Sequence, residues 1–155
     1  MTEQEYLTLR HEGLAPEYRD GEVVERYGDD FSHGSMRATL AGLPLPGYGA
    51  MSQSIRLRPG RWVVADLAVY YPDEPAEDYP TTTPFLVIEV LARQDRMMEV
   101  LSKLAEYREF GVTHVWLADP PGRKLYVMES EFRQVTTWQI QQPPLRISAE
   151  DVFDS

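Results

Sequence analysis

The segment from Phe85 to Ala118 constrains the fold more than any other part of the sequence. Phe85–Leu91 is a nearly continuous apolar run, which is typical of a central strand buried on both faces. Asp95–Phe110 follows with apolar residues at helical spacing, and Gly111 supplies a C-cap. His114–Ala118 is a second apolar run. The segment therefore predicts a parallel, right-handed strand–helix–strand unit.

Further elements are expected on both sides of this unit. Thr2 and Glu5 form the pattern of a capping box, which predicts a helix over Thr2–Arg10. A second helix is expected over His33–Leu43. Strands and a final edge hairpin are expected over Glu22–Tyr27, Ser52–Arg58, Trp62–Tyr70, Lys124–Met128 and Arg133–Ile140. We expect an α/β fold with a mixed β-sheet flanked by helices, in a single domain spanning residues 1–155.

Composition limits the kinds of site that the chain can build. The sequence has no cysteine, which excludes disulfides and thiolate metal sites. A bound metal must therefore use Asp, Glu, His or backbone oxygen, a donor set that favours hard cations. No apolar run approaches the roughly 18 residues that span a bilayer, and the polar, acidic start is unlike a signal peptide. These features predict a soluble, cytoplasmic protein.

The net charge argues against a general nucleic-acid binder. The chain carries 15 Lys and Arg residues against 25 Asp and Glu residues, which gives −10 at pH 7. Affinity for nucleic acid comes largely from neutralising phosphates with cationic side chains, so this balance is unfavourable. It does not exclude a small basic patch or a phosphate contact made through a bound cation.

Two apolar strands each contain a single acid, Asp66 in one and Glu89 in the other. An isolated carboxylate in an apolar interior is very costly, so both residues need an explanation. Each acid can lie at a strand end, face solvent or pair with arginine. Alternatively, the two strands are neighbours and the carboxylates converge on a divalent cation, which removes their mutual repulsion. The helix that follows the second strand favours the convergent arrangement because it carries a lysine.

That lysine is Lys103, which borders the apolar face of the predicted helix. At 100° per residue it lies about 60° from Val100 and about 40° from Tyr107. Its stem can therefore run along the sheet and present the ammonium group near a strand end. An ordinary surface lysine with its stem on apolar neighbours fits the same position.

Several motifs resemble the Uma-type family of endonucleases, which has the PD-(D/E)xK restriction-endonuclease-like fold. The similarity covers roughly Thr2 to Met128. Two positions depart from the superfamily pattern: Ala65 precedes the first acid where proline is usual, and Leu91 stands where lysine is usual. The matching segments are Glu17–Glu22, His33, Val64–Val69, Phe85–Leu91, Asp95, Lys103, Tyr107, Gly111–Val112 and His114–Pro120.

The resemblance implies a metal-dependent endonuclease that hydrolyses phosphodiester bonds. Asp66 and Glu89 would hold Mg²⁺ or Mn²⁺. Lys103, moved from the strand to the helix, would orient or help to deprotonate the attacking water and offset phosphate charge. Glu17 would add an outer ligand through water. His33 would contact phosphate, or act as a structural hydrogen-bonding histidine, and Asp95 is expected to cap the main helix rather than bind metal.

Nucleic acid, with DNA favoured, is the expected substrate, and RNA or a small phosphate ester remains an alternative. A homodimer is expected through the final hairpin, where Tyr126, Val135 and Trp138 lie near a sheet edge. The competing class is a catalytically inactive scaffold or binding protein that keeps the nuclease fold, since a fold does not determine a function.

Overall fold

A computed structural model describes residues 1–13, 15–26 and 30–154. The first helix, α1 (Glu3–His11), begins at Thr2 with the expected capping box, and the other helices are α2 (Phe31–Ala41), α3 (Met97–Phe110) and α4 (Ala149–Phe153). The strands of the main sheet are β1 (Glu17–Arg19), β2 (Glu22–Val24), β3 (Tyr48–Arg58), β4 (Arg61–Tyr70), β5 (Leu86–Val90), β6 (His114–Asp119), β7 (Lys124–Met128) and β8 (Phe132–Val135). A separate pair consists of β9 (Thr137–Ile140) and β10 (Leu145–Ser148).

The main sheet is mixed, as the sequence predicts. Within the described chain its strands follow the order β2-β1-β4-β5-β6-β7-β8, and β3 pairs with β4. Among the strand pairs of the described residues, only β5 and β6 are parallel, and α3 joins them; the other pairs are antiparallel. The predicted strand–helix–strand unit is therefore confirmed, with β5 fully buried. This is the expected α/β fold, and no helix in the described residues is long and apolar enough to cross a membrane.

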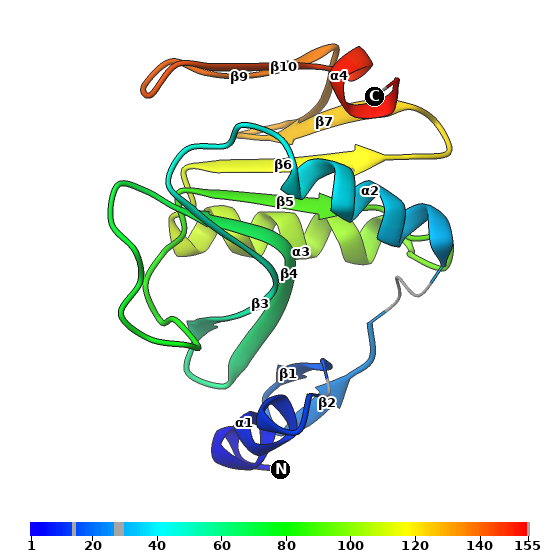
Figure 1. The fold of residues 1–155 in the computed structure, drawn as a ribbon. Coiled ribbons are helices and arrows are strands. Elements are labelled where there is room, and N and C mark those ends of the chain that lie inside the picture. Colours follow the sequence, from blue (N-terminus) through cyan, green and yellow to red (C-terminus); the bar gives the residue numbers. More distant parts are fainter. Residues whose placement is uncertain (14, 27–29, 155) are drawn as a thin grey trace.

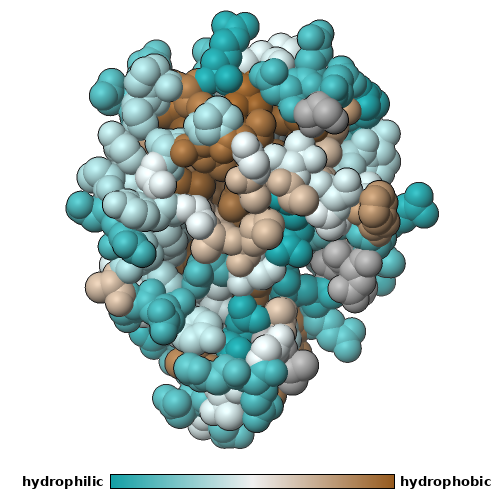
Figure 2. Space-filling view, in the orientation of Figure 1, coloured by the Kyte–Doolittle hydropathy of each residue, from teal (hydrophilic) through white to brown (hydrophobic). Residues whose placement is uncertain are grey.

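Helices cover both faces of the sheet (Figure 1). Met36 and Leu40 of α2 pack with Ile88 and Trp116 on one face. Leu104 and Tyr107 of α3 pack on the other face. Figure 2 shows an apolar area beside α2, over strands that the helix leaves uncovered. The partly buried residues that complete this packing are Leu43, Leu45, Phe85, Val135, Leu145, Ala149 and Phe153.

The start of α3 differs from the expected one. The sequence suggests that Asp95 caps the helix, but the N-cap is Arg96, which makes no side-chain capping bond. The Asp95 carboxylate instead accepts a hydrogen bond from Ala92 N–H at 2.7 Å. It therefore closes the turn between β5 and α3 rather than the helix end. The C-terminal end agrees with the prediction, since Gly111 adopts a left-handed conformation at φ 103°.

The predicted terminal hairpin is wrong in its second strand. Arg133–Ile140 does not form one strand: β8 completes the main sheet, and β9 leaves it to pair with β10. Trp138 is fully buried and stacks on Trp116 with ring centroids 4.8 Å apart. Burial of this ring in the core requires the chain to turn away from the sheet edge.

At the other end, sequence reasoning missed β1 and gave one strand over Glu22–Tyr27. The strand observed there, β2, ends at Val24, and Tyr27 lies outside the described residues. The second helix starts two residues before the expected His33, since Asp30 caps it by accepting a bond from His33 N–H.

Strand β4 changes partners along one of its edges, and this creates the setting of the candidate site. Leu67–Val69 pair with β5, whereas Arg61 and Trp62 pair with β1. Along this edge, no strand-pair register within the described chain includes residues 63–66. Backbone polar groups between the two partner strands need other partners, because unpaired buried N–H and C=O groups are costly.

Candidate active site

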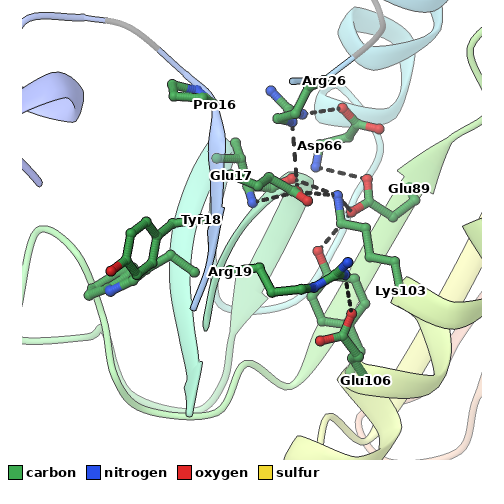
Figure 3. Close-up of polar contacts among 12 residues, drawn as sticks. Pro16, Glu17, Tyr18, Arg19, Arg26, Asp66, Glu89, Lys103 and Glu106 are labelled. Atoms are coloured by element: carbon green, nitrogen blue, oxygen red, sulfur yellow. Dashed lines mark hydrogen bonds and ion pairs between the residues drawn. The ribbon is translucent and has the colours of Figure 1, made fainter. Parts of the chain in front are cut away.

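Residues 63–66 of β4 lie between the part of the strand that pairs with β1 and the part that pairs with β5, and this segment is called here the fork of β4. Charged side chains contact the backbone at the fork. Val64 N–H donates to Glu17 Oε2 at 2.9 Å, and Val64 C=O accepts from Lys103 Nζ at 3.0 Å. Asp66 N–H donates to Glu89 Oε2 at 3.2 Å. The three predicted residues Asp66, Glu89 and Lys103, together with Glu17, therefore lie in one group, called here the carboxylate cluster (Figure 3).

Lys103 occupies the centre of this cluster. Its ammonium group lies 2.6 Å from Glu17 Oε2 and 2.9 Å from Glu89 Oε1. With the Val64 carbonyl, these contacts use all three ammonium protons. Burial acts to lower the pKa of Lys103, but the Glu17 and Glu89 carboxylates outweigh it and raise the pKa above its usual value. Lys103 is therefore a fixed cation in this arrangement.

Asp66 is surrounded by hydrogen-bond donors. Val90 N–H donates to Asp66 Oδ2 at 2.8 Å, and His33 Nε2 lies 3.2 Å from the same oxygen. Arg26 Nη2 lies 3.2 Å from Asp66 Oδ1, and Arg37 Nε lies 3.8 Å from that atom. The second ring nitrogen of His33 has no hydrogen-bond partner among the described residues. The structure thus places Glu17 within the cluster and His33 in contact with it through Asp66.

Sequence reasoning missed three residues of the site. Arg26 contacts Asp66 and Glu17 from the segment after β2. Tyr107 O–H donates to Glu89 Oε1 at 2.7 Å from α3. Arg61, at the start of β4, lies 3.7 Å from Glu17 Oε1 and also pairs with Glu106. Of the three, only Tyr107 had a sequence signal: it is one of the positions that match the family, and it lies one helical turn after Lys103 and therefore on the same face.

The two central carboxylates are driven in opposite directions. Burial raises the pKa of Glu89 to about 7, and the nearby Asp66 adds to the rise although Lys103 opposes it. Burial also disfavours ionised Asp66, but hydrogen bonding, with His33 the largest contributor, lowers the pKa of Asp66 below its usual value. Asp66 is therefore the permanent anion, and Glu89 is the carboxyl that takes up a proton near neutral pH.

The raised pKa of Glu89 predicts that the fold loses stability as the pH rises. The pKa is 4.5 for the free side chain and about 7 in the folded protein. The protonated carboxyl therefore stabilises the fold fully below pH 4.5, and this contribution is lost as the pH rises through about 7. We expect Glu89→Gln, which cannot ionise, to gain stability relative to the wild type between about pH 5 and 8.

Thermal denaturation of both proteins across this range measures the effect. Glu131→Gln, at an exposed turn residue, is the control and should give a difference that does not change with pH. A difference between Glu89→Gln and the wild type that stays constant across the range would contradict the prediction.

A cavity of about 350 Å³ opens beside the cluster. Among the described residues its lining holds six carboxylates, four Lys or Arg side chains and His33, so the wall has no cationic excess. Each of the four cations is also in an ion pair with an acid. The lining residues with charge are Glu17, Arg19, Glu25, Arg26, His33, Arg61, Asp66, Glu89, Asp95, Glu99 and Lys103.

The donor set of the cluster fits Mg²⁺ or Mn²⁺. Among residues 1–13, 15–26 and 30–154, no group of three His, Cys, Asp or Glu side chains is arranged to hold a metal ion. Magnesium keeps several of its waters, however, and is commonly bound through one or two carboxylates. Asp66 and Glu89 supply such a pair, and Asp66 Oδ1 already has a cationic group 3.2 Å away, the guanidinium of Arg26.

A solved structure has the same mixed α/β fold. The structure is similar to the crystal structure of "a putative nuclease belonging to DUF820" from Anabaena variabilis, with a TM-score of 0.75. The match covers 99% of this chain and 98% of that chain at 17% sequence identity. An identity this low shows a shared fold only.

The sequence itself identifies the family. Residues 3–155 match the model of the family Uma2, described as "Putative restriction endonuclease". The chain therefore belongs to the Uma2 family, as the motifs in the sequence indicated. A search of curated proteins found no match.

Proposed function

We propose that this protein is a divalent-metal-dependent endonuclease that hydrolyses phosphodiester bonds of nucleic acid. The observation that carries the proposal is the meeting of Asp66, Glu89 and Lys103 at the fork of β4, beside a cavity of about 350 Å³. Membership of a family of restriction-endonuclease-like proteins supports it. DNA is the first substrate to test, followed by RNA and small phosphate esters.

Asp66 and Glu89 hold the metal in this proposal. Magnesium or manganese, when bound, supplies Lewis-acid activation of water and charge stabilisation at the phosphorus. Asp66 provides a carboxylate that stays ionised, and Glu89 loses its proton when the ion binds. Glu17 holds Lys103 in place through an ion pair. It also lines the cavity, where it orients water.

Lys103 acts as a cation rather than as a base. Its three protons are committed to acceptors, and its pKa is raised, so deprotonation of water by this amine is unfavourable. Its charge holds Glu17 and Glu89 together and offsets part of the phosphate charge. This assignment keeps the charge role suggested by the sequence and sets aside the role in deprotonation.

Cleavage of mixed nucleic acids tests the proposal. Purified protein is incubated with single-stranded DNA, duplex DNA and RNA in Mn²⁺, and in a parallel sample with a chelator. Cleavage products are expected in Mn²⁺ and none with the chelator, because the carboxylate pair has no other way to activate water. Absence of products from every substrate in Mn²⁺ would contradict the proposal.

A second candidate, a binding protein that keeps the nuclease fold without its reaction, is favoured by one observation. Asp66 and Glu89 are already neutralised by Arg26, His33 and Lys103. In that case the buried charges serve only to satisfy the backbone groups exposed at the fork of β4. Failure of the protein to bind Mn²⁺ would decide for this candidate.

We also propose a homodimer, with the contact placed at β8. Trp138, expected at this surface, lies in the core, and the ring of Tyr126 stacks on Phe132. In the described sheet, β8 is a terminal strand, and an edge strand offers its free backbone groups to a second copy. Light scattering is expected to give the dimer mass at micromolar protein; a monomer mass across that range would remove the proposal.

A further inference from the structure

The contacts that hold Arg26 in place differ from those of the other cationic side chains of the site. Its guanidinium lies 3.2 Å from Asp66 Oδ1 and 3.9 Å from Glu17 Oε2, and both partners belong to the carboxylate cluster (Figure 3). Its side chain is 18% exposed and lines the cavity. It comes from a segment after β2 rather than from within a helix or strand. Its position therefore depends on the negative charge of Asp66 and Glu17.

The neighbouring cations have additional anchors. Lys103 is bound to the Val64 carbonyl as well as to its two carboxylates. Arg37 donates to Ser52 Oγ, and Arg61 makes two hydrogen bonds to Glu106. These side chains keep partners when the charge on Asp66 is neutralised. Arg26 loses its shortest ion pair.

We propose that Arg26 is a phosphate-binding residue that changes partners when the site is loaded. It pairs with Asp66 in this structure, and it would move to a phosphate of the nucleic acid when Asp66 takes a divalent cation. The inference rests on the proposed function, because it needs a cation on Asp66. Its physical cause is that a divalent cation held by Asp66 would repel the guanidinium that lies 3.2 Å from Asp66 Oδ1 and would compete with it for the Asp66 carboxylate.

The charge of the cavity explains why the released side chain matters. The described wall has six carboxyl groups against four Lys or Arg side chains and His33, so it offers a phosphate no excess of positive charge before the metal binds. A bound metal would add positive charge and would also free the Arg26 guanidinium, which lines the cavity. A guanidinium offers a planar fork of donors that matches two phosphate oxygens. Metal binding and substrate binding are thereby coupled through one side chain.

The first test measures metal affinity without nucleic acid. Mn²⁺ binding is followed by titration calorimetry for the wild type, Arg26→Met, Arg26→Lys and Arg19→Met. Arg19 lines the same cavity but pairs with Glu106, so it is the matched control. We expect Arg26→Met to bind Mn²⁺ about tenfold more tightly, and Arg26→Lys and Arg19→Met to stay close to the wild type. A purely structural role for Arg26 predicts no tightening.

The second test measures binding of a cleavage-resistant phosphorothioate DNA oligonucleotide in saturating Mn²⁺. Arg26→Met is expected to bind it about tenfold more weakly, and its plot of log affinity against log salt should be shallower by about one phosphate contact. Arg26→Met remains folded in this scheme because His33 and Arg37 still face Asp66. Circular dichroism checks this.

The outcomes separate the inference from the proposed function. Tighter Mn²⁺ binding with weaker DNA binding in Arg26→Met supports the exchange of partners. Unchanged or weaker Mn²⁺ binding in a folded Arg26→Met variant overturns the inference about Arg26. The proposed nuclease function still stands in that case, provided that the wild type binds Mn²⁺. DNA binding that is unaffected by the substitution overturns the transfer to phosphate. Failure of both the wild type and Arg26→Met to bind Mn²⁺ overturns the inference and the proposed function together.

Discussion

Replacing Asp66 by asparagine is expected to reduce Mn²⁺-dependent cleavage by more than about 100-fold, since loss of groups that only support metal ligands already costs 10–100-fold. Asparagine keeps the shape of the side chain and can still accept the bond from Val90 N–H. It removes the charge of Asp66, whose pKa lies below its usual value. The effect should therefore fall on metal affinity and rate, measured by calorimetry and by cleavage of labelled DNA.

A matched substitution controls for the chemistry of the change. Asp20→Asn also converts a carboxylate to an amide, at an exposed turn where Asp20 pairs with Arg58. Asparagine tolerates the left-handed conformation found there, so this variant should cleave within about twofold of the wild type. A folded Asp66→Asn variant that cleaves like the wild type would show that Asp66 does not hold the metal. Thermal denaturation separates loss of the site from loss of the fold.

The central unit of the fold could be predicted because its signals are local. The apolar run of β5, the spacing within α3 and the glycine after it each specify one element, and a parallel crossover joins them in one way. The single acids in β4 and β5 were also informative, because burial of a lone carboxylate is costly wherever it occurs. These features place Asp66, Glu89 and Lys103 in one hypothesis from the sequence alone.

The rest of the site depends on topology that the sequence does not show. Arg26 follows a three-residue strand, and its partners are Asp66, forty positions away, and Glu17. Arg61 is nearly fully buried although it is a charged residue beside a turn. Both arginines, Arg26 and Arg61, are needed because of the fork of β4. There, Val64 and Asp66 have backbone groups that only side chains can satisfy. No local pattern predicts that a strand changes partners.

The prediction for the C-terminal region is wrong for a different reason. The sequence of residues 133–140 predicts one continuous strand, but the two halves of this segment bury residues against different surfaces. Trp138 stacks on Trp116 and donates from Nε1 to the Tyr126 carbonyl at 3.0 Å. This packing bends the chain at Thr136, between β8 and β9. Burial against the core thus outweighs the local preference for an uninterrupted strand.

Lys103→Met is expected to have the largest effect on stability, lowering the free energy of unfolding by about 3–5 kcal/mol. Methionine keeps most of the stem but removes the ammonium between Glu17 and Glu89, which are 5% and 6% exposed. Two buried carboxylates then lack their shared counter-charge. The melting temperature should fall on the order of 10 °C for a domain of this size. Lys124→Met, at the exposed start of β7, is the control and should change stability by less than about 0.5 kcal/mol.

The loss in Lys103→Met should depend on pH with a definite sign. The ammonium of Lys103 acts to lower the pKa of both Glu17 and Glu89, so its removal moves both upward. Carboxyls with raised pKa values are protonated as the pH falls, and the protonated forms need no counter-charge. The deficit should therefore be largest above about pH 7 and shrink toward pH 5. A deficit of equal size at both pH values would show that lost packing, not lost charge, causes it.

Manganese connects this stability effect to the proposed chemistry. If Asp66 and Glu89 hold a divalent cation, the ion supplies positive charge that Lys103→Met lacks, beside the same Glu89 carboxylate that Lys103 contacts at 2.9 Å. Saturating Mn²⁺ should then raise the melting temperature of Lys103→Met by more than it raises that of the wild type. In the double variant Lys103→Met with Asp66→Asn, one metal ligand is absent and the extra rise should disappear. An equal rise in all three proteins would mean that manganese binds elsewhere, and the buried charges of the fork would then have a structural role only.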